Sequence, residues 1–238
     1  MKKIKNFFKY FWSARIELNL LFILSILYII SVRFIINDYP EPFKGAYKLG
    51  WIFYTLALAY ISSYIFYFVV VHLKTIKDKK AINEFIAPIT YRLVGDGRCI
   101  FSELCKKVGV TNKAFPPDKK VVEEICTINP HSEAPMVTQA LQRVNWLYYL
   151  KHYMFRSKGS ISKIFERMPY LESDLIKLLS RIDDSVYFSE IEAITWTPIR
   201  NKDFSFLVNS LCNYFILTND LEKYANKNLK EYLSKRRM

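Results

Sequence analysis

The sequence predicts an all-α protein in which an N-terminal hairpin of two transmembrane helices precedes a compact cytoplasmic helical domain. Two long apolar stretches lie before residue 72, basic residues flank the pair, and the remaining chain carries apolar residues at helical spacing. We expect an interfacial segment at residues 1–15, the two-span hairpin at 16–72 and the cytoplasmic domain at 73–238.

The first fifteen residues form a basic, aromatic segment without an acid. Its bases are Lys2, Lys3, Lys5, Lys9 and Arg15. Its aromatic residues Phe7, Phe8, Phe11 and Trp12 recur at helical spacing. Such a segment can lie in the headgroup plane as an interfacial helix, so we expect it to anchor the chain at the membrane surface.

The first predicted span runs from Leu18 to Ile36 and carries a single charge, Arg33. Its length corresponds to about 28 Å of helix, close to the hydrocarbon core of about 30 Å. Arg33 lies near the outer end, so we expect its head to reach the headgroups, with a gating charge as the alternative. A cleaved signal peptide is disfavoured because Asn37-Asp38-Tyr39 follows the stretch instead of small residues.

The second predicted span, Gly50 to Val71, has no charge, and a connection containing Pro40 and Pro42 separates it from the first. Within it the small residues Thr55, Ala59 and Ser63 recur every four positions. A stripe of this kind lets another helix approach closely. We expect the first span to be that partner, with self-association between chains as the alternative.

The distribution of basic residues predicts the topology. Bases precede the first span and follow the second, where Lys74 and Lys77 lie, whereas the connection is balanced. The positive-inside rule then places both termini in the cytoplasm, across an inner, or plasma, membrane. The net charge of +13 belongs mainly to these flanks, so no nucleic-acid partner is expected.

Helical periodicity continues beyond the second span. A helix is expected to leave the membrane through residues 72–87 and to kink or end at Pro88. Further helices are expected near 137–155, 161–168, 171–182 and 204–215. Breaks are predicted at Gly95-Asp96-Gly97, Pro116-Pro117, Asn129-Pro130, Gly159, Pro169 and Pro198. The β-branched stretch 194–199 is expected to be a short strand or an extended loop.

One segment, Ser102 to Thr111, resembles the first helix and turn of a helix-turn-helix motif through its Leu-x-x-x-x-Gly-Val-Thr pattern. A recognition helix would have to follow over several turns, and Pro116-Pro117 stops it. We interpret the segment as a genuine turn without a DNA-binding function.

Catalytic and metal-binding patterns are weak. The cysteines, Cys99, Cys105, Cys126 and Cys212, match no zinc spacing, so buried structural thiols are the interpretation. His152 is either a general base or a packed side chain, and Asp183-Asp184 either binds a divalent cation or forms a solvated turn. We expect no cofactor and no metal, and nothing in the sequence requires an enzyme.

These observations favour an inner-membrane protein whose hairpin tethers a helical protein-interaction domain to the cytoplasmic face. Its expected partners are the lipid bilayer, an unidentified cytoplasmic protein and a second copy of the chain. One alternative is a small oligomeric channel or membrane-disrupting effector gated by the cytoplasmic domain. Another alternative is a membrane-tethered enzyme.

Overall fold

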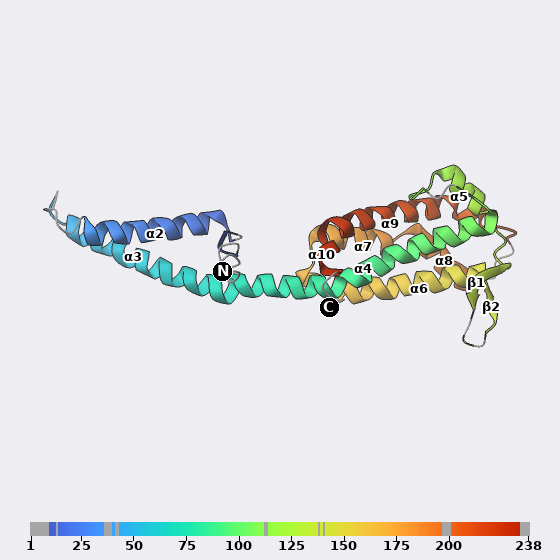
Figure 1. The fold of residues 1–238 in the computed structure, drawn as a ribbon, viewed down its shortest axis with the longest axis horizontal. Coiled ribbons are helices and arrows are strands. Elements are labelled where there is room, and N and C mark those ends of the chain that lie inside the picture. Colours follow the sequence, from blue (N-terminus) through green and yellow to red (C-terminus); the bar gives the residue numbers. More distant parts are fainter. Residues whose placement is uncertain are drawn as a thin grey trace. The chain divides into compact units, whose positions relative to one another are not determined.

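The computed structural model describes residues 10–12, 14–35, 40, 43–111, 114–137, 139, 141–196 and 201–233. These residues are mostly helical, which confirms the predicted fold class in its coarse form. The chain divides into two compact units, which we call the hairpin unit (Met1–Lys80) and the helical unit (Ala81–Met238) (Figure 1).

In the hairpin unit, α2 (Ile16–Phe34) and α3 (Ala46–Phe66) lie side by side (Figure 1). A π-helical turn, Tyr67–His72, follows α3 and leads directly into α4 (Leu73–Val108). Both α2 and the apolar part of the second helical stretch are long and apolar enough to cross a membrane. Only 6% and 17% of their most apolar windows are buried within the structure.

Aromatic side chains hold the hairpin together at the end where α2 begins. The rings of Phe22 and Tyr64 stack with centroids 4.4 Å apart, and Phe11 packs edge-on against both. Phe68, in the π-helical turn, also stacks on Tyr64, with ring centroids 6.2 Å apart. The short N-terminal segment around Phe11 therefore folds back onto the hairpin.

Neutral hydrogen bonds accompany this aromatic packing. The buried Asn19 donates its amide to the carbonyl of Phe11 over 2.8 Å and accepts the hydroxyl of Tyr64. Tyr60 donates to the Leu18 carbonyl at 2.9 Å, and Tyr28 donates to the Gly50 carbonyl at 3.2 Å. These polar side chains of the hairpin thus have partners within it.

The helical unit contains most of α4 and the elements that follow. They are α5 (Lys119–Ile125), β1 (Glu133–Val137), β2 (Arg143–Asn145), α6 (Trp146–Phe165), α7 (Ser173–Asp183), α8 (Val186–Trp196), α9 (Val208–Asn228) and α10 (Lys230–Leu233), with 3₁₀ turns at Met168–Tyr170 and Ser205–Leu207. β1 and β2 pair antiparallel with an irregular register. The core is strongly aromatic; its largest fully buried side chains include Trp146, Tyr187, Phe188, Phe204, Tyr214 and Phe215.

The predicted breaks at Gly95-Asp96-Gly97 and Gly159 were wrong, as was an end of the helix at Pro88, because all three lie inside helices, while a kink at Pro88 stays a prediction. Pro88 and the Gly95-Asp96-Gly97 segment are in α4, and Gly159 is in α6. Ile86 and Ala87 are fully buried next to Pro88, so tertiary packing compensates for the backbone hydrogen bond that proline removes.

Gly97 serves close packing and not chain breaking. A Cβ atom at this position would lie 2.7 Å from Cγ2 of Thr218 on α9, so only glycine fits here without a shift. The neighbouring Asp96 is buried and pairs with Arg156 of α6. The glycine and aspartate residues that suggest a turn in the sequence are therefore explained by contacts with two other helices, α9 and α6.

The segment predicted as one helix over 137–155 is instead a strand pair followed by a helix. Val137 ends β1, and Leu141, between the strands, adopts the left-handed conformation with φ of 60°. The side chain of Asn145 accepts the backbone N–H of Tyr148 over 2.8 Å and so begins α6.

The other predicted boundaries have mixed outcomes. The stretch expected as a strand or loop from residue 194 belongs to α8 as far as Trp196, and Pro198 lies outside the described residues. The turn at Gly109 (φ of 85°) is confirmed, as are the breaks near Pro116-Pro117, Asn129-Pro130 and Pro169.

Candidate binding groove and the polar network beside it

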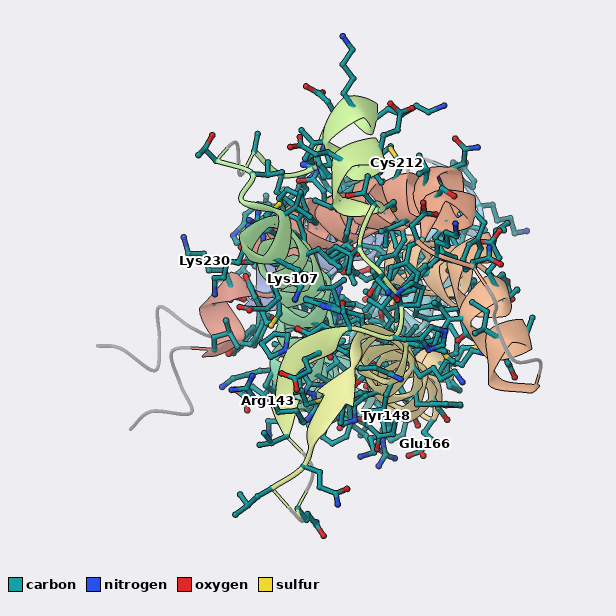
Figure 2. All side chains as sticks on the ribbon, turned by 90° about the vertical axis from the view of Figure 1, so that its right-hand side faces the viewer. Lys107, Arg143, Tyr148, Glu166, Cys212 and Lys230 are labelled. Carbon is teal, nitrogen blue, oxygen red and sulfur yellow. The ribbon has the colours of Figure 1, made fainter. Side chains whose placement is uncertain are left out.

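A groove of about 530 Å³ lies between β1 and the last turns of α4 in the helical unit. Every residue of β1 lines it, both the inward-facing Ala134 and Met136 and the exposed Glu133. Successive side chains of a strand point to opposite faces, so a groove lined by both sets runs along the edge of the strand. Figure 2 shows this end of the unit, with Lys107 of α4 and Arg143 of β2 labelled.

Trp146, the first residue of α6, also lines this groove. Its side chain is 1% exposed, and its ring packs edge-on against Tyr149 with centroids 5.2 Å apart. The indole N–H has no hydrogen-bond partner within the described parts of the chain. A buried donor without an acceptor is unfavourable. The indole N–H of Trp146 is therefore a hydrogen-bond donor that the described residues leave unsatisfied.

Charged side chains line the rim of the groove. Lys106 contacts Glu103 at 2.5 Å along α4, and Arg143 contacts Glu133 at 2.7 Å across the strands. The hydrogen bond to Glu103 raises the pKa of Lys106, which keeps its ammonium charged. Lys107 has no ion-pair partner among the residues that the structure describes, so the rim carries an excess of positive charge.

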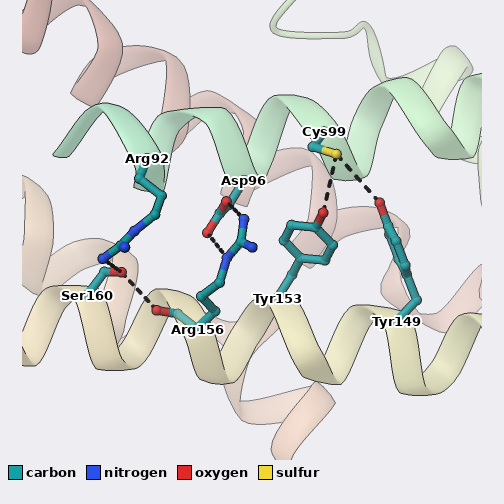
Figure 3. A network of polar contacts seen from close by, with 7 residues as sticks. All are labelled: Arg92, Asp96, Cys99, Tyr149, Tyr153, Arg156 and Ser160. Carbon is teal, nitrogen blue, oxygen red and sulfur yellow. Dashed lines mark hydrogen bonds and ion pairs between the residues drawn. The ribbon is translucent and has the colours of Figure 1, made fainter. Parts of the chain in front are cut away.

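A network of polar side chains joins α4 to α6 next to the groove (Figure 3). Arg156 donates from Nε to Asp96 Oδ2 over 2.8 Å and from Nη2 to Oδ1 of the same carboxylate. Its guanidinium also lies over the ring of Tyr153, 4.7 Å from the centroid. The hydrogen bonds to Asp96 raise the pKa of Arg156, so this buried carboxylate faces a permanent cation.

Cys99 continues the network along α4 to Tyr153 and Tyr149 of α6 (Figure 3). Its sulfur lies 3.4 Å from the hydroxyl of Tyr153 and 3.7 Å from that of Tyr149. Burial, followed by the contact with Cys99, raises the pKa of the Tyr149 phenol, which therefore stays protonated. Because Tyr149 also packs on Trp146, this contact couples α4 to one of the residues that line the groove.

Two further contacts extend the network in the other direction. Arg92 donates to the hydroxyl of Ser160 over 3.4 Å, and that hydroxyl donates to the carbonyl of Arg156 over 2.9 Å. The network therefore fixes α4, which provides one wall of the groove, relative to α6, which provides Trp146. Its geometry is suited to holding two helices in place, whereas the adjacent groove is open to a ligand.

The predicted helix-packing residues lie on a different face from the one expected. Thr55, Ala59 and Ser63 are exposed on α3, whereas Ala57 and Tyr64 are buried. The residues buried against α2 recur on the opposite side of a helix with 3.6 residues per turn. The prediction that Thr55, Ala59 and Ser63 pack on the first span was therefore wrong. Contact of these residues with another chain stays a prediction.

The membrane-flanking residues are only partly described. Lys2, Lys3, Lys5 and Lys9 lie outside the described residues. Trp12, Arg15, Lys74 and Lys77 are exposed, as is Arg33 in the last turn of α2. Their exposure is compatible with headgroup contacts, which remain a prediction.

The cysteines and acids singled out from the sequence are scattered. Cys105 and Cys126 are buried as predicted, while Cys99 and Cys212 are only partly buried. Burial raises the pKa of the Cys126 thiol to about 12. Burial likewise raises the pKa of Asp183, and His152 is half-buried beside Tyr153. No cluster of three or more metal-binding side chains occurs within the ranges described.

Sequence reasoning missed the groove because it assigned the residues of β1 to the break that begins at Asn129-Pro130. It assigned the residues of β2 to a helix over 137–155. The helix-capping Asn145 was the signal that could have placed the start of the helix at residue 146 and left the residues before it for another structure. Comparison with known proteins finds no matching family model, no similar curated protein and no similar solved structure.

Proposed function

We propose that this chain is an inner-membrane protein that tethers a helical protein-binding domain to the cytoplasmic face of the bilayer. One observation carries the proposal: the hairpin presents large apolar side chains to its surroundings. Leu20, Leu24 and Leu27 on α2 are each about half exposed, and Trp51, Phe53 and Leu56 on α3 are exposed to a similar degree.

The bilayer is the environment that accounts for this surface. Burying a leucine or phenylalanine side chain is favourable by about 1.5–3 kcal/mol, so leaving many of them in water would be very costly. Within lipid tails, helices satisfy the backbone polar groups internally. The hydrogen bonds of Asn19, Tyr60 and Tyr64 meet the same requirement for the side chains.

Charge supports the orientation, and the groove supports the binding role. Arg15 precedes α2, and Lys74 and Lys77 follow the apolar part of the second helix, so the positive-inside rule favours a cytoplasmic helical unit. In that unit, the groove beside β1 is an open surface with apolar walls and a charged rim. We therefore propose that the groove contacts the protein partner.

Fractionation and labelling test the tether. The full chain should stay in the membrane pellet after an alkaline wash and be released only by detergent. In intact cells, a membrane-impermeant maleimide should label Lys48→Cys, in the first turn of α3, but neither the wild-type chain nor Lys230→Cys. Lys230→Cys should become labelled once the membrane is opened. Release without detergent, or labelling of Lys230→Cys in intact cells, would refute the proposal.

An oligomeric channel is the second candidate, favoured by the exposed small residues on α3. Thr55, Ala59 and Ser63 lie opposite the buried face of the helix, where another copy of the hairpin could approach. If so, Thr55→Leu should weaken cross-linked oligomers in detergent, whereas Ile52→Leu should not. Ion flux into liposomes would then test for a pore. A monomeric wild-type chain would eliminate this candidate.

A further inference from the structure

We infer that the groove between β1 and the C-terminal end of α4 binds an extended, acidic peptide segment of the partner protein. This inference rests on the proposed protein-binding role and names the ligand class of that site. Three features carry it: the shape of the groove, the backbone groups along its edge and the charge of its rim.

The shape fits an extended chain. The groove follows the whole length of β1, with the last turns of α4 as its opposite wall. The exposed Pro135 and the partly buried Met136 contribute apolar surface, and Val137 adds an exposed apolar side chain at the far end of the strand. A strand-length groove with apolar sides suits a peptide whose side chains alternate between the groove and the solvent.

The open edge of β1 offers backbone hydrogen-bonding groups. Trp146 donates its N–H to the carbonyl of Ser132, so the backbone of Ser132 faces β2. Alternate residues of an antiparallel strand face opposite edges, so Glu133, the next residue, directs its backbone groups to the open edge. The regular alternation ends there, because the register shifts between Glu133 and Val137. Glu133 provides a donor and an acceptor there, whereas Pro135 has no backbone N–H to offer. Backbone pairing is therefore short, and side chains must supply most of the recognition.

The charge of the rim selects an acidic ligand. Lys107 has no ion-pair partner in the described residues, and its ammonium is exposed at the groove. Lys106 and Arg143 are held only by ion pairs open to water, which contribute little and exchange readily. A carboxylate entering the groove gains contact with Lys107 directly, and the guanidinium of Arg143 offers a second, fork-shaped site.

Fluorescence anisotropy on the full chain in detergent tests the inference. The probe is fluorescein-labelled hexaglutamate, compared with hexaglutamine and hexalysine at one fixed ionic strength. Hexaglutamate should bind, and the other two peptides should not. Lys107→Glu should weaken binding by about ten-fold or more, because it replaces an attraction by a repulsion. Lys230→Glu is the matched control: it changes an exposed lysine of α10 and gives the same net charge, so binding should persist.

The outcomes separate the possible explanations. Lys107→Gln should weaken binding less than Lys107→Glu, and both variants should melt at the wild-type temperature, which excludes unfolding. Equal losses for Lys107→Glu and Lys230→Glu would overturn the inference in favour of non-specific charge attraction. Binding of phosphatidylglycerol vesicles through Lys107, without binding of hexaglutamate, would replace the peptide by a lipid surface. If the chain stays in the membrane pellet but binds no hexaglutamate, the tether stands and only this inference fails.

Discussion

The hairpin unit and the helical unit distribute their side chains in opposite ways. In the hairpin, leucine and phenylalanine side chains such as Leu24 and Phe53 are exposed, and the polar Asn19 is buried. In the helical unit, Phe101 and Phe215 are fully buried in contact with each other. The same residue types are therefore exposed in one unit and buried in the other, as the proposed lipid surroundings of the hairpin would require.

Their buried polar contacts differ in kind as well. The hairpin uses neutral groups, as in the contact between Asn19 and Tyr64, whereas the helical unit buries the carboxylate of Asp96 against Arg156. An ion pair in hydrocarbon would carry a large desolvation penalty, whereas Arg156 keeps part of its guanidinium in water. The contrast fits one unit in lipid and the other in water, and substitutions in matched pairs can test it.

The largest expected difference concerns phenylalanine truncation. Phe215→Ala should destabilise the helical unit by about 3–5 kcal/mol, because it leaves a cavity against Phe101 and Phe115. Phe53→Ala, on the exposed face of α3, should change stability by less than about 0.5 kcal/mol. Thermal unfolding of the detergent-solubilised chain, followed by circular dichroism, measures both. Equal effects would show that the two units share one kind of core.

Introducing a charge should have the larger effect in the hairpin unit, whereas phenylalanine truncation should have the larger effect in the helical unit. Leu24→Lys places an ammonium in the middle of α2 and should oppose membrane insertion by about 3 kcal/mol. Ile216→Lys, on the exposed side of α9, should be nearly neutral for folding. The fraction of chain in the membrane pellet measures the first effect, and the melting temperature measures the second. Full insertion of Leu24→Lys would remove the main argument for a lipid surrounding.

Glycine positions sharpen the comparison of packing. Gly97→Ala would place a methyl group against Thr218, whose hydroxyl is already bonded to the Tyr214 carbonyl, and should cost about 1–3 kcal/mol. Gly50→Ala in α3 meets only Tyr28, at 4.0 Å, and should be tolerated. Adding Thr218→Ser to Gly97→Ala should restore part of the loss in a chemical denaturation series. Tolerance of Gly97→Ala alone would mean that α4 and α9 pack loosely.

Much of the fold was predictable because hydrophobic periodicity is a local property. The apolar stretches of α2 and α3, and the amphipathic α7 and α9, were visible as residue patterns. The continuity of α4 through Pro88 and Gly97 was not, because it depends on side chains that contact it from elsewhere in the chain. The direction of the Thr55 stripe failed for a similar reason: small residues permit close approach without specifying the partner.

The candidate groove was the least predictable feature. It requires Lys107 on α4 and Arg143 on β2 to line the same groove, which no spacing in the sequence indicates. Leu141 adds a further obstacle, because a leucine in the left-handed conformation contradicts its usual preference and hides the turn between the strands. Single-sequence patterns therefore located the helices but not the surface between a helix end and a strand pair.

The smallest expected effect tests whether the neutral contacts in the hairpin matter individually. Tyr64→Phe removes the donor to the side-chain oxygen of Asn19 and should destabilise the hairpin by about 1 kcal/mol, as is usual for such bonds in membranes. Tyr60→Phe should cost less, because the Leu18 carbonyl keeps its bond within α2.

Unfolding in a denaturing-detergent series measures both tyrosine variants. The double variant with Asn19→Ala then separates the pairwise contact from general packing, since the aromatic stack with Phe22 survives both phenylalanine substitutions. If Tyr64→Phe has no effect when Asn19 is present, the stack alone holds the hairpin. The polar contrast between the two units would then lie only in the ion pair of Asp96 and Arg156.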